Sequence, residues 1–481
     1  MHRCNICDQP RKQAPRTGYS NLLAHLNAKH PTHGEEYTEF QRRNLSPLDV
    51  FGFVDQDTSS MYDCLRWIVE RNMPLSEVES PLTRQLVKMR PTTPATVKSY
   101  MRRVAERVGN AIAVEMGSVV SLMFDGWTHS SHHFVAIFAV HDGSDGRQER
   151  LIGLSPMEHG LTADALIECL NAVLGVYNKD TSVCKYLVGD NCSTNQSMAT
   201  KLGVPLVGCA SHRFNLAMGV FLESSTDLIS QIQNLMIHLR IPNIAAELAR
   251  HTEYAAIRSN TTRWSSVWEM VRRYVKIRDA IMKVAAVEDL VPRGAAQRRI
   301  LVLDDKLEKL DSVCKKLQYA KRTMVEVRAL FDACIEKYPI MAEHLSAGAD
   351  IVQSPGFETA VVKMTTLVPL MATELKALEP FRQTEPRQQQ TPNDGPMDFA
   401  TEIPRRSKKP RRSERGLSNY IPLMATIPPT SNRCERLFSE CKYVLTPHRS
   451  SMQPANFKMI MFLKANCDLV TAATLLPYII Q

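Results

Sequence analysis

A change in the spacing of apolar residues near position 119 sets the strongest limit on how this chain can fold. Before this position, apolar residues recur every three or four positions, which predicts helices over 61–70, 83–89 and 96–116. After it, short apolar runs bounded by turn residues predict strands that are separated by helices. The expected order is strand 119–124, strand 134–140, strand 149–157, helix 163–177, strand 186–188, a short helix and strand 205–209.

This order of elements is the one expected of an RNase H-like α/β core. Helical spacing continues from 212 to 382, which predicts that an all-α insertion domain interrupts the core. We expect six parts: a small zinc finger at 1–35, a helical DNA-binding or dimerisation segment at 60–117, the first part of the core at 118–222, the helical insertion domain at 223–382, a disordered basic linker at 383–419, and the last part of the core with a dimerisation region at 420–481. The polar residues 31–57 are expected to form a linker.

Composition narrows the class of protein. Hydrophobic residues make up 44% of the 481 residues, which is enough for a packed core. Lys and Arg exceed Asp and Glu by 59 − 50 = 9, and this mild excess suits a protein that meets a polyanion. The 12 cysteines are too few for a disulfide scaffold, and no apolar run is long enough to cross a membrane. We therefore expect neither a secreted nor a membrane protein.

Two cysteines and two histidines near the N-terminus have the spacing of a zinc site. Cys4 and Cys7 form a Cys-x2-Cys pair, and His25 and His30 follow on a predicted short helix. The two histidines are five positions apart, so they face one ion only if the last helical turn tightens into a 3₁₀ turn. The alternative is two unrelated cysteines and a helix that happens to carry histidines.

Basic residues lie in the loop between these cysteines and histidines. Arg11, Lys12 and Arg16 are suited to contact DNA phosphates. The segment 1–35 resembles a BED-type zinc finger, a DNA-binding module common at the N-termini of transposases. The resemblance implies a structural Zn²⁺ ion and double-stranded DNA as a partner.

Two carboxylates each follow an apolar strand run. Asp125 follows the run at 119–124, and Asp190 follows the run at 186–188. Ligands of an open α/β sheet collect at the carboxyl ends of its strands, and carboxylates there can share Mg²⁺. Two-ion phosphodiester chemistry needs a third carboxylate as well. The alternative is that each Asp caps a turn or a helix.

Five sequence blocks resemble those of hAT-superfamily transposases and occur in the same order. They are residues 124–128, 188–191, 208–216, 260–264 and 427–439. The resemblance implies that Glu435 is the third acid beside Asp125 and Asp190, with Mg²⁺ or Mn²⁺ as the catalytic ion. Asp190 and Glu435 are 435 − 190 = 245 residues apart, and this long gap fits a helical insertion domain.

His212 lies in the block that resembles the family's Cys-x2-His motif. Near developing phosphate charge it could donate a hydrogen bond or shuttle a proton. Two alternatives stay open, namely a buried core histidine and a partial zinc site shared with Cys209.

Arg263 and Trp264 lie in the block that resembles the family's Arg-Trp motif. The resemblance implies that Trp264 stacks on a DNA base flipped out of the duplex, while Arg263 holds a phosphate. The alternative is that Trp264 is a core residue on the apolar stripe of its helix.

Two further segments indicate where the protein acts and what it binds. Residues 404–415 hold seven basic residues and one acidic residue, which is typical of a nuclear import signal or a nucleic-acid contact, although a solvated linker is the alternative. The amphipathic stretch with Phe457, Met461, Phe462 and Leu463 resembles the hAT dimerisation region, which implies a homodimer or higher homo-oligomer. It could also be core within one chain.

These features together predict a nuclear, DNA-binding hAT-type transposase that cleaves DNA and transfers strands at a two-metal carboxylate site. The alternative is a catalytically inactive, transposase-derived regulator that keeps the zinc finger and binds DNA. It is suggested by the three residues that precede Cys4 and by the lack of a Trp-bearing helical segment just ahead of the block that carries Glu435. A metal-dependent hydrolase of small phosphates is disfavoured by the finger and the basic segments.

Overall fold

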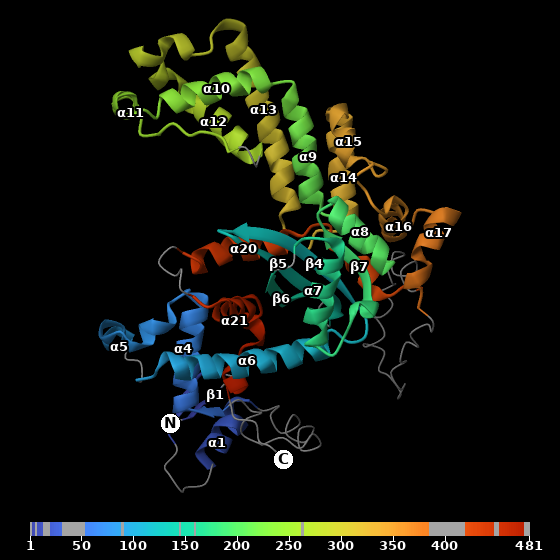
Figure 1. Cartoon of the computed structure of the whole chain (residues 1–481). Helices are drawn as coiled ribbons and strands as arrows, with labels where there is room; N and C mark the ends of the chain where they lie inside the picture. The colour runs from blue at the N-terminus through green and yellow to red at the C-terminus, as the bar shows by residue number, and fades with distance from the viewer. Residues whose placement is uncertain are drawn as a thin grey trace, which may run out of the picture. The chain divides into compact units, whose positions relative to one another are not determined.

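The computed structural model describes residues 2–4, 7–12, 20–30, 53–87, 91–143, 146–157, 160–260, 264–383, 419–446 and 452–475. These residues form a mixed α/β protein in which helices predominate (Figure 1). The chain divides into two compact units, one with residues Met1–Val183 and Cys434–Gln481 and the other with residues Cys184–Arg433. The predicted linker at 383–419, with its basic run at 404–415, lies almost wholly outside the described residues.

Three helices open the main part of the first unit. They are α4 (Gln56–Glu70), α5 (Pro81–Val87) and α6 (Pro94–Glu115), which confirms the three predicted helices. The longest, α6, begins where the Thr93 hydroxyl accepts a hydrogen bond from the Thr96 backbone N–H and Pro94 supplies a helical φ angle. Its buried side chains recur every three or four positions, at Val97, Met101, Val104, Val108 and Ile112.

An antiparallel meander follows these helices. Its strands are β4 (Val120–His129), β5 (His132–Gly143) and β6 (Gly146–Pro156). The β4–β5 turn contains Ser130 at φ 54°, and His132, the first residue of β5, is exposed beside it. Helix α7 (Ala163–Gly175) comes next, capped by the Thr162 hydroxyl.

The second unit begins with two parallel strands. These are β7 (Cys184–Gly189) and β8 (Leu206–Gly208), with helix α8 (Ser193–Leu202) between them. Within the first unit the strand order is β6-β5-β4, and within the second unit β7 is the neighbour of β8. The predicted α/β class and the predicted order of strands and helices are therefore confirmed, whereas the RNase H-like assignment stays a prediction.

Helices make up most of the rest of the second unit. They are α9 (Ala210–Glu223), α10 (Thr226–His238), α11 (Pro242–Leu248), α12 (Trp264–Ile281), α13 (Gly294–Leu317), α14 (Met324–Lys337), α15 (Ala342–Leu345), α16 (Pro355–Thr366) and α17 (Ala372–Leu378). Helices α9 to α15 share one apolar core. Unbroken helix from 212 to 382 was expected, and this is wrong for residues 252–260, which are irregular.

The C-terminal part holds two helices among the described residues. They are α20 (Asn432–Val444) and α21 (Pro454–Ala465), and Pro454 begins the second because proline suits the first helical position. Helix α21 packs on β6, α6 and α4 (Figure 1). Its residues Phe457, Met461 and Leu463 are buried there, so they are core within one chain.

A small sheet precedes these elements near the N-terminus. Strand β1 (His2–Cys4) pairs antiparallel with β2 (Pro10–Arg11) and with β3 (Phe53–Asp55), and helix α1 (Ser20–Lys29) lies between β2 and β3 in the chain. The expectation of a linker at 31–57 is therefore wrong for residues 53–55, which pair with residues 2–4. None of the helices in the described ranges is long and apolar enough to cross a membrane.

Candidate functional site

Four side chains near the N-terminus converge as potential metal ligands. The Sγ atoms of Cys4 and Cys7 and ring nitrogens of His25 and His30 all lie within 4.8 Å of one another. Cys7 Sγ is 3.2 Å from His25 Nε2, and Cys4 Sγ is 3.6 Å from His30 Nε2. Two thiols and two imidazoles at this separation are compatible with a tetrahedral zinc site.

The backbone explains how these four residues meet. The Asp8 N–H donates to the Cys4 carbonyl at 2.7 Å, and Asp8 adopts φ 57°, so the chain turns sharply between the two cysteines. The His30 N–H donates to the Leu26 carbonyl at 2.8 Å. This is an α-helical bond, so the expected 3₁₀ tightening is wrong. His30 lies one residue beyond the end of α1, and its side chain reaches the site from there.

The electrostatic setting of His25 favours metal binding. Burial lowers the pKa of His25, and the nearby cations Arg11, His30 and Lys29 lower it further. The ring is therefore held in its neutral form at neutral pH, which is the form that ligates zinc.

The basic residues of the finger loop that are predicted to contact phosphates differ in their surroundings. Nη2 of Arg11 lies 2.9 Å from His25 Nδ1 and 3.1 Å from Gln9 Oε1, so this side chain is turned toward the finger. Lys12 is exposed, and Arg16 lies outside the described residues. Their contact with DNA stays a prediction.

Asp125 lies within a strand and not after one. Strand β4 continues four residues beyond it, because Asp125 and its successors stay paired with β5, Asp125 opposite Ala136. The expectation that the strand ends at 124 is therefore wrong. The residues of β4 up to Phe124 are buried. From Asp125 onward half-buried and exposed residues alternate, so Asp125 marks the point where the strand leaves the core. Its Oδ1 accepts the Gly126 N–H at 2.8 Å.

Asp190 directly follows β7, as the sequence predicts. Its Oδ2 atom lies 3.1 Å from Nδ1 of His212, which is in the first turn of α9. Asn195 holds the Asp190 carbonyl through its Nδ2 at 2.9 Å. The His212 side chain is 30% exposed, so the alternative of a buried core histidine is wrong.

Cys209 is a buried thiol, and among the described residues it belongs to no group of three or more potential metal ligands. Burial raises its pKa to about 12, and the nearby Asp190 carboxylate contributes in the same direction. Its Sγ accepts a hydrogen bond from the Ser431 N–H at 3.4 Å, and the Ala210 N–H donates to the Pro429 carbonyl at 2.9 Å. These bonds hold the 427–431 segment against the start of α9.

Glu435 is exposed in the first turn of α20. The preceding residue, Cys434, has its Sγ 4.0 Å from the carbonyl oxygen of Ala136, which pairs with Asp125. One turn later, Phe438 stacks on Trp127 of β4 with ring centroids 5.5 Å apart. The start of α20 is thus fixed beside the part of β4 that carries Asp125. Whether Asp190 joins these two acids stays a prediction, because it belongs to the other unit.

Trp264 begins α12 and is 8% exposed. Its ring meets the Phe214 ring edge-on at 6.0 Å within the helical core. Trp264 therefore lies where the alternative interpretation, a core residue of its helix, places it. Its stacking on a DNA base stays an untested prediction. Arg263 lies outside the described residues.

Sequence reasoning missed a close approach between Asn191 and Gly208. A Cβ atom on Gly208 would lie 1.8 Å from Asn191 Oδ1, so only glycine fits here. Asn191 Nδ2 also donates to the Ile351 carbonyl at 2.9 Å. The available signal was the glycine itself, since a glycine at the end of a buried strand often marks close packing.

Part of the chain matches a known protein family. Residues 417–467 match the family model described as the hAT family C-terminal dimerisation region. This range contains Glu435 and all of α20 and α21, and it relates the chain to hAT-family transposases. No curated protein matches the chain.

Proposed function

We propose that this chain, whose residues 417–467 are those of the hAT C-terminal region, is a transposase-type enzyme that cleaves DNA and transfers strands. Asp125, Asp190 and Glu435 would hold Mg²⁺ or Mn²⁺. The observation that carries the proposal is the anchoring of α20, because Cys434 and Phe438 on either side of Glu435 contact the hairpin that carries Asp125.

The donor set suits hard divalent ions. Carboxylate oxygens are the ligands that Mg²⁺ prefers, and Glu435 is exposed while Asp125 and Asp190 are half-buried. Divalent ions, when bound, supply Lewis acidity that activates the attacking hydroxyl or water and stabilises the leaving oxygen.

His212 would orient and tune the Asp190 carboxylate. A carboxylate that accepts a hydrogen bond on one oxygen is fixed in direction and can still ligate through the other. Nδ1 of His212 lies 3.1 Å from Oδ2 of Asp190, where its N–H would donate to the carboxylate. His212 would therefore carry a proton close to the scissile phosphate.

The order of elements supports an RNase H-like core for this chemistry. Three antiparallel strands, then a helix, a strand, a helix and a strand follow each other as expected for such a core. Asp190 lies at the carboxyl end of β7, where ligands of α/β sheets collect.

The N-terminal finger would bind DNA. The basic run at 404–415 would act as a nuclear import signal. The four convergent ligand side chains of the finger support a structural Zn²⁺ ion. A fold with two- and three-residue strands and one ten-residue helix has little core of its own, so metal binding would supply its folding free energy.

Self-association would use residues other than the apolar face of α21. That face is buried against β6 and α6, whereas Tyr443 of α20 is 70% exposed. An exposed tyrosine within the matched region is a suitable anchor for a second copy of the chain.

The experiment is a cleavage assay with the full chain on DNA that carries the terminal inverted repeats of its element, in Mg²⁺ or Mn²⁺. Asp190→Asn is expected to abolish cutting and to leave DNA binding intact. Asp279→Asn, a fully exposed carboxylate on α12, is the matched control and should cut like the wild type. Equal cutting by wild type and Asp190→Asn would refute the proposal.

A second candidate is a DNA-binding regulator without cleavage activity. The observation that favours it is the N-terminal ligand group, which is complete without any of the three acids. In that case the wild type would not cut, acid variants would bind DNA like the wild type, and zinc chelation would abolish binding. DNA binding that survives chelation would exclude the finger as the contact.

A further inference from the structure

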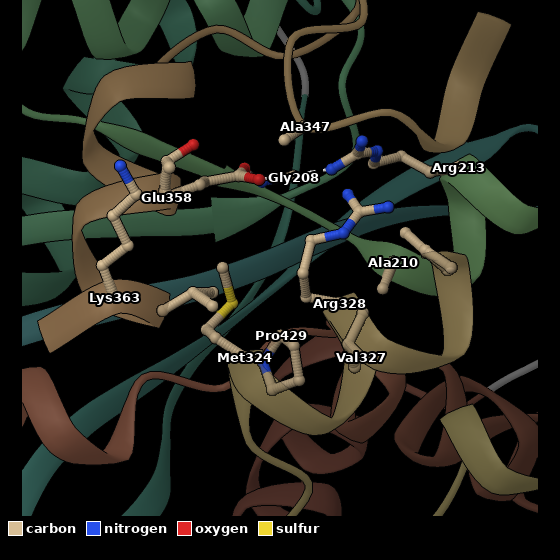
Figure 2. A pocket seen from close by; sticks show the side chains of 13 residues that line it. Gly208, Ala210, Arg213, Met324, Val327, Arg328, Ala347, Glu358, Lys363 and Pro429 are labelled. Carbon is tan, nitrogen blue, oxygen red and sulfur yellow. Dashed lines mark hydrogen bonds and ion pairs between the residues drawn. The ribbon is translucent and has the colours of Figure 1, made fainter. Parts of the chain in front are cut away.

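The second unit encloses a cavity of about 210 Å³ between α9, α14 and α16 (Figure 2). Helix α14 contributes three apolar side chains, Met324, Val327 and Phe331, together with Arg328. Helix α16 contributes the charged side chains Glu358 and Lys363 together with Thr359 and Val362. The lining therefore combines apolar side chains with charged ones.

Cations outnumber anions in the lining. Arg213, Arg328 and Lys363 face one carboxylate, Glu358, which gives 3 − 1 = +2 in the lining. The carboxylates that pair with Arg328 and Lys363 are Asp332 and Glu374, and neither lines the cavity. The lining itself therefore carries a formal charge of +2, and the two carboxylates that balance it lie outside the cavity.

The buried Arg213–Glu358 pair is already satisfied. Nη1 of Arg213 donates to Glu358 Oε2 at 3.2 Å, and its other nitrogens donate to the carbonyls of His344 and Ser346. Figure 2 shows these two side chains pointing toward each other. Burial lowers the pKa of Arg213; Glu358 opposes this shift and the nearby Arg328 cation adds to it. These bonds use three of the five N–H groups of Arg213, and Glu358 balances its charge within the lining.

Lys363 has hydrogen-bonding capacity left. Its Nζ donates to Glu374 Oε1 at 2.7 Å, and this is its one ion pair among the described residues. An ammonium carries three N–H groups, so two remain for a ligand. A carboxylate, with its two oxygens, matches them.

We propose that this cavity binds a small aromatic monocarboxylate, with its ring against Met324, Val327 and Phe331 and its carboxylate on Lys363. The volume suits such a ligand, because an apolar cavity of about 150 Å³ is known to accept benzene. The remainder of the 210 Å³ holds the charged arm. The combination of apolar side chains with a few convergent polar groups is that of small-molecule sites.

A ligand bound in the cavity would affect the positions of the candidate catalytic residues, because lining residues and His212 share the same backbone segment. Ala210 and Arg213 line the cavity from the same helical turn that carries His212. Pro429 lines it too, and its carbonyl holds the Ala210 N–H. The binding site itself does not depend on the proposed cleavage activity.

The test uses the full chain with ¹³C-labelled methionine methyl groups, observed by NMR. Phenylacetate is the probe. Its uncharged counterpart is 2-phenylethanol, and acetate carries the carboxylate but lacks the aromatic ring. The Met324 signal is assigned with Met324→Leu. We expect phenylacetate to shift this signal and to bind at least about tenfold more tightly than 2-phenylethanol, with no shift from acetate.

Two variants locate the site. Lys363→Met combined with Glu374→Gln removes the charge without leaving a buried carboxylate unpaired, and should weaken phenylacetate about tenfold and leave 2-phenylethanol unchanged. Ala347→Phe fills the cavity and should abolish both. Lys309→Met with Asp305→Asn removes an exposed pair on α13 outside the cavity and is the matched control.

The proposal is overturned if phenylacetate leaves the Met324 signal unchanged or binds no better than 2-phenylethanol. It is also overturned if the Lys363 and Glu374 double variant binds phenylacetate like the wild type. The comparison of ligands on the unaltered chain decides the matter even if a variant does not fold.

Discussion

Nδ1 of His212 lies 3.1 Å from Oδ2 of Asp190. The two residues come from different elements, since Asp190 follows β7 and His212 is in the first turn of α9. The pair joins a candidate metal ligand to a group that can carry a proton.

Replacing His212 with Ala should slow DNA cleavage by about 10²-fold or more, because positioned proton donors contribute about that much. DNA binding should not change. Single-turnover cleavage and a DNA-binding titration measure the two effects separately. His238→Ala, a half-buried histidine on α10 whose Nδ1 lies 2.9 Å from the Asn234 carbonyl of the same helix, is the control. If both variants cleave at the wild-type rate, His212 has no part in the reaction.

Gly208→Ala should destabilise the protein by about 1–3 kcal/mol, the range for a side chain forced into a packed site. The new Cβ would lie 1.8 Å from Asn191 Oδ1, so the residue after Asp190 would have to move. Urea unfolding measures the change. Gly219→Ala in the middle of α9 is the control, because it has no atom within 4 Å and should stabilise slightly. A Gly208→Ala protein as stable as the wild type would contradict the close packing of Asn191.

The buried Cys209 thiol should make the free energy of unfolding fall as the pH rises. Its pKa is raised from 9.0 to about 12 by burial, so the folded state keeps the proton that the unfolded state releases. This contribution is complete below pH 9 and is lost between about pH 9 and 12. Between pH 8 and pH 10 the wild type should lose about 1.4 kcal/mol more than Cys209→Ala. Urea unfolding at both pH values tests this, and identical losses would show that the thiol titrates normally.

Zinc should bind the N-terminal finger in a ratio of one ion per chain. Cys7→Ser should lose the ion, because a hydroxyl is a poor replacement for a thiolate ligand. Native mass spectrometry measures the stoichiometry. Cys467→Ser, an exposed cysteine far along the chain, is the control and should retain zinc. Retention of zinc by Cys7→Ser would place the ion elsewhere.

Sequence periodicity predicted the elements whose signals are local. Helix α6 has five buried positions at helical spacing, and β5 is an apolar run of strand length, so both could be read from neighbouring residues alone. The zinc-ligand group was equally accessible, because Cys4 and Cys7 are close in sequence and His25 and His30 are five positions apart.

Features that depend on distant partners could not be predicted in this way. Strand β3 has three residues and exists because it pairs with β1, about fifty positions earlier. Asp125 stays within β4 because β5 continues to pair with it. The Arg213–Glu358 pair joins residues 145 positions apart, and neither residue carries a local signal of burial.

The central claim is that Asp125, Asp190 and Glu435 hold the same divalent ions. The most direct measurement is single-turnover cleavage of terminal-repeat DNA by the three variants Asp125→Cys, Asp190→Cys and Glu435→Cys, in Mg²⁺ and in Mn²⁺. Thiolate is a poor ligand for Mg²⁺ and a better one for softer ions. Each variant is therefore expected to be inactive with Mg²⁺ and to recover cleavage with Mn²⁺, whereas wild-type cleavage by any one of them in Mg²⁺ would contradict the claim.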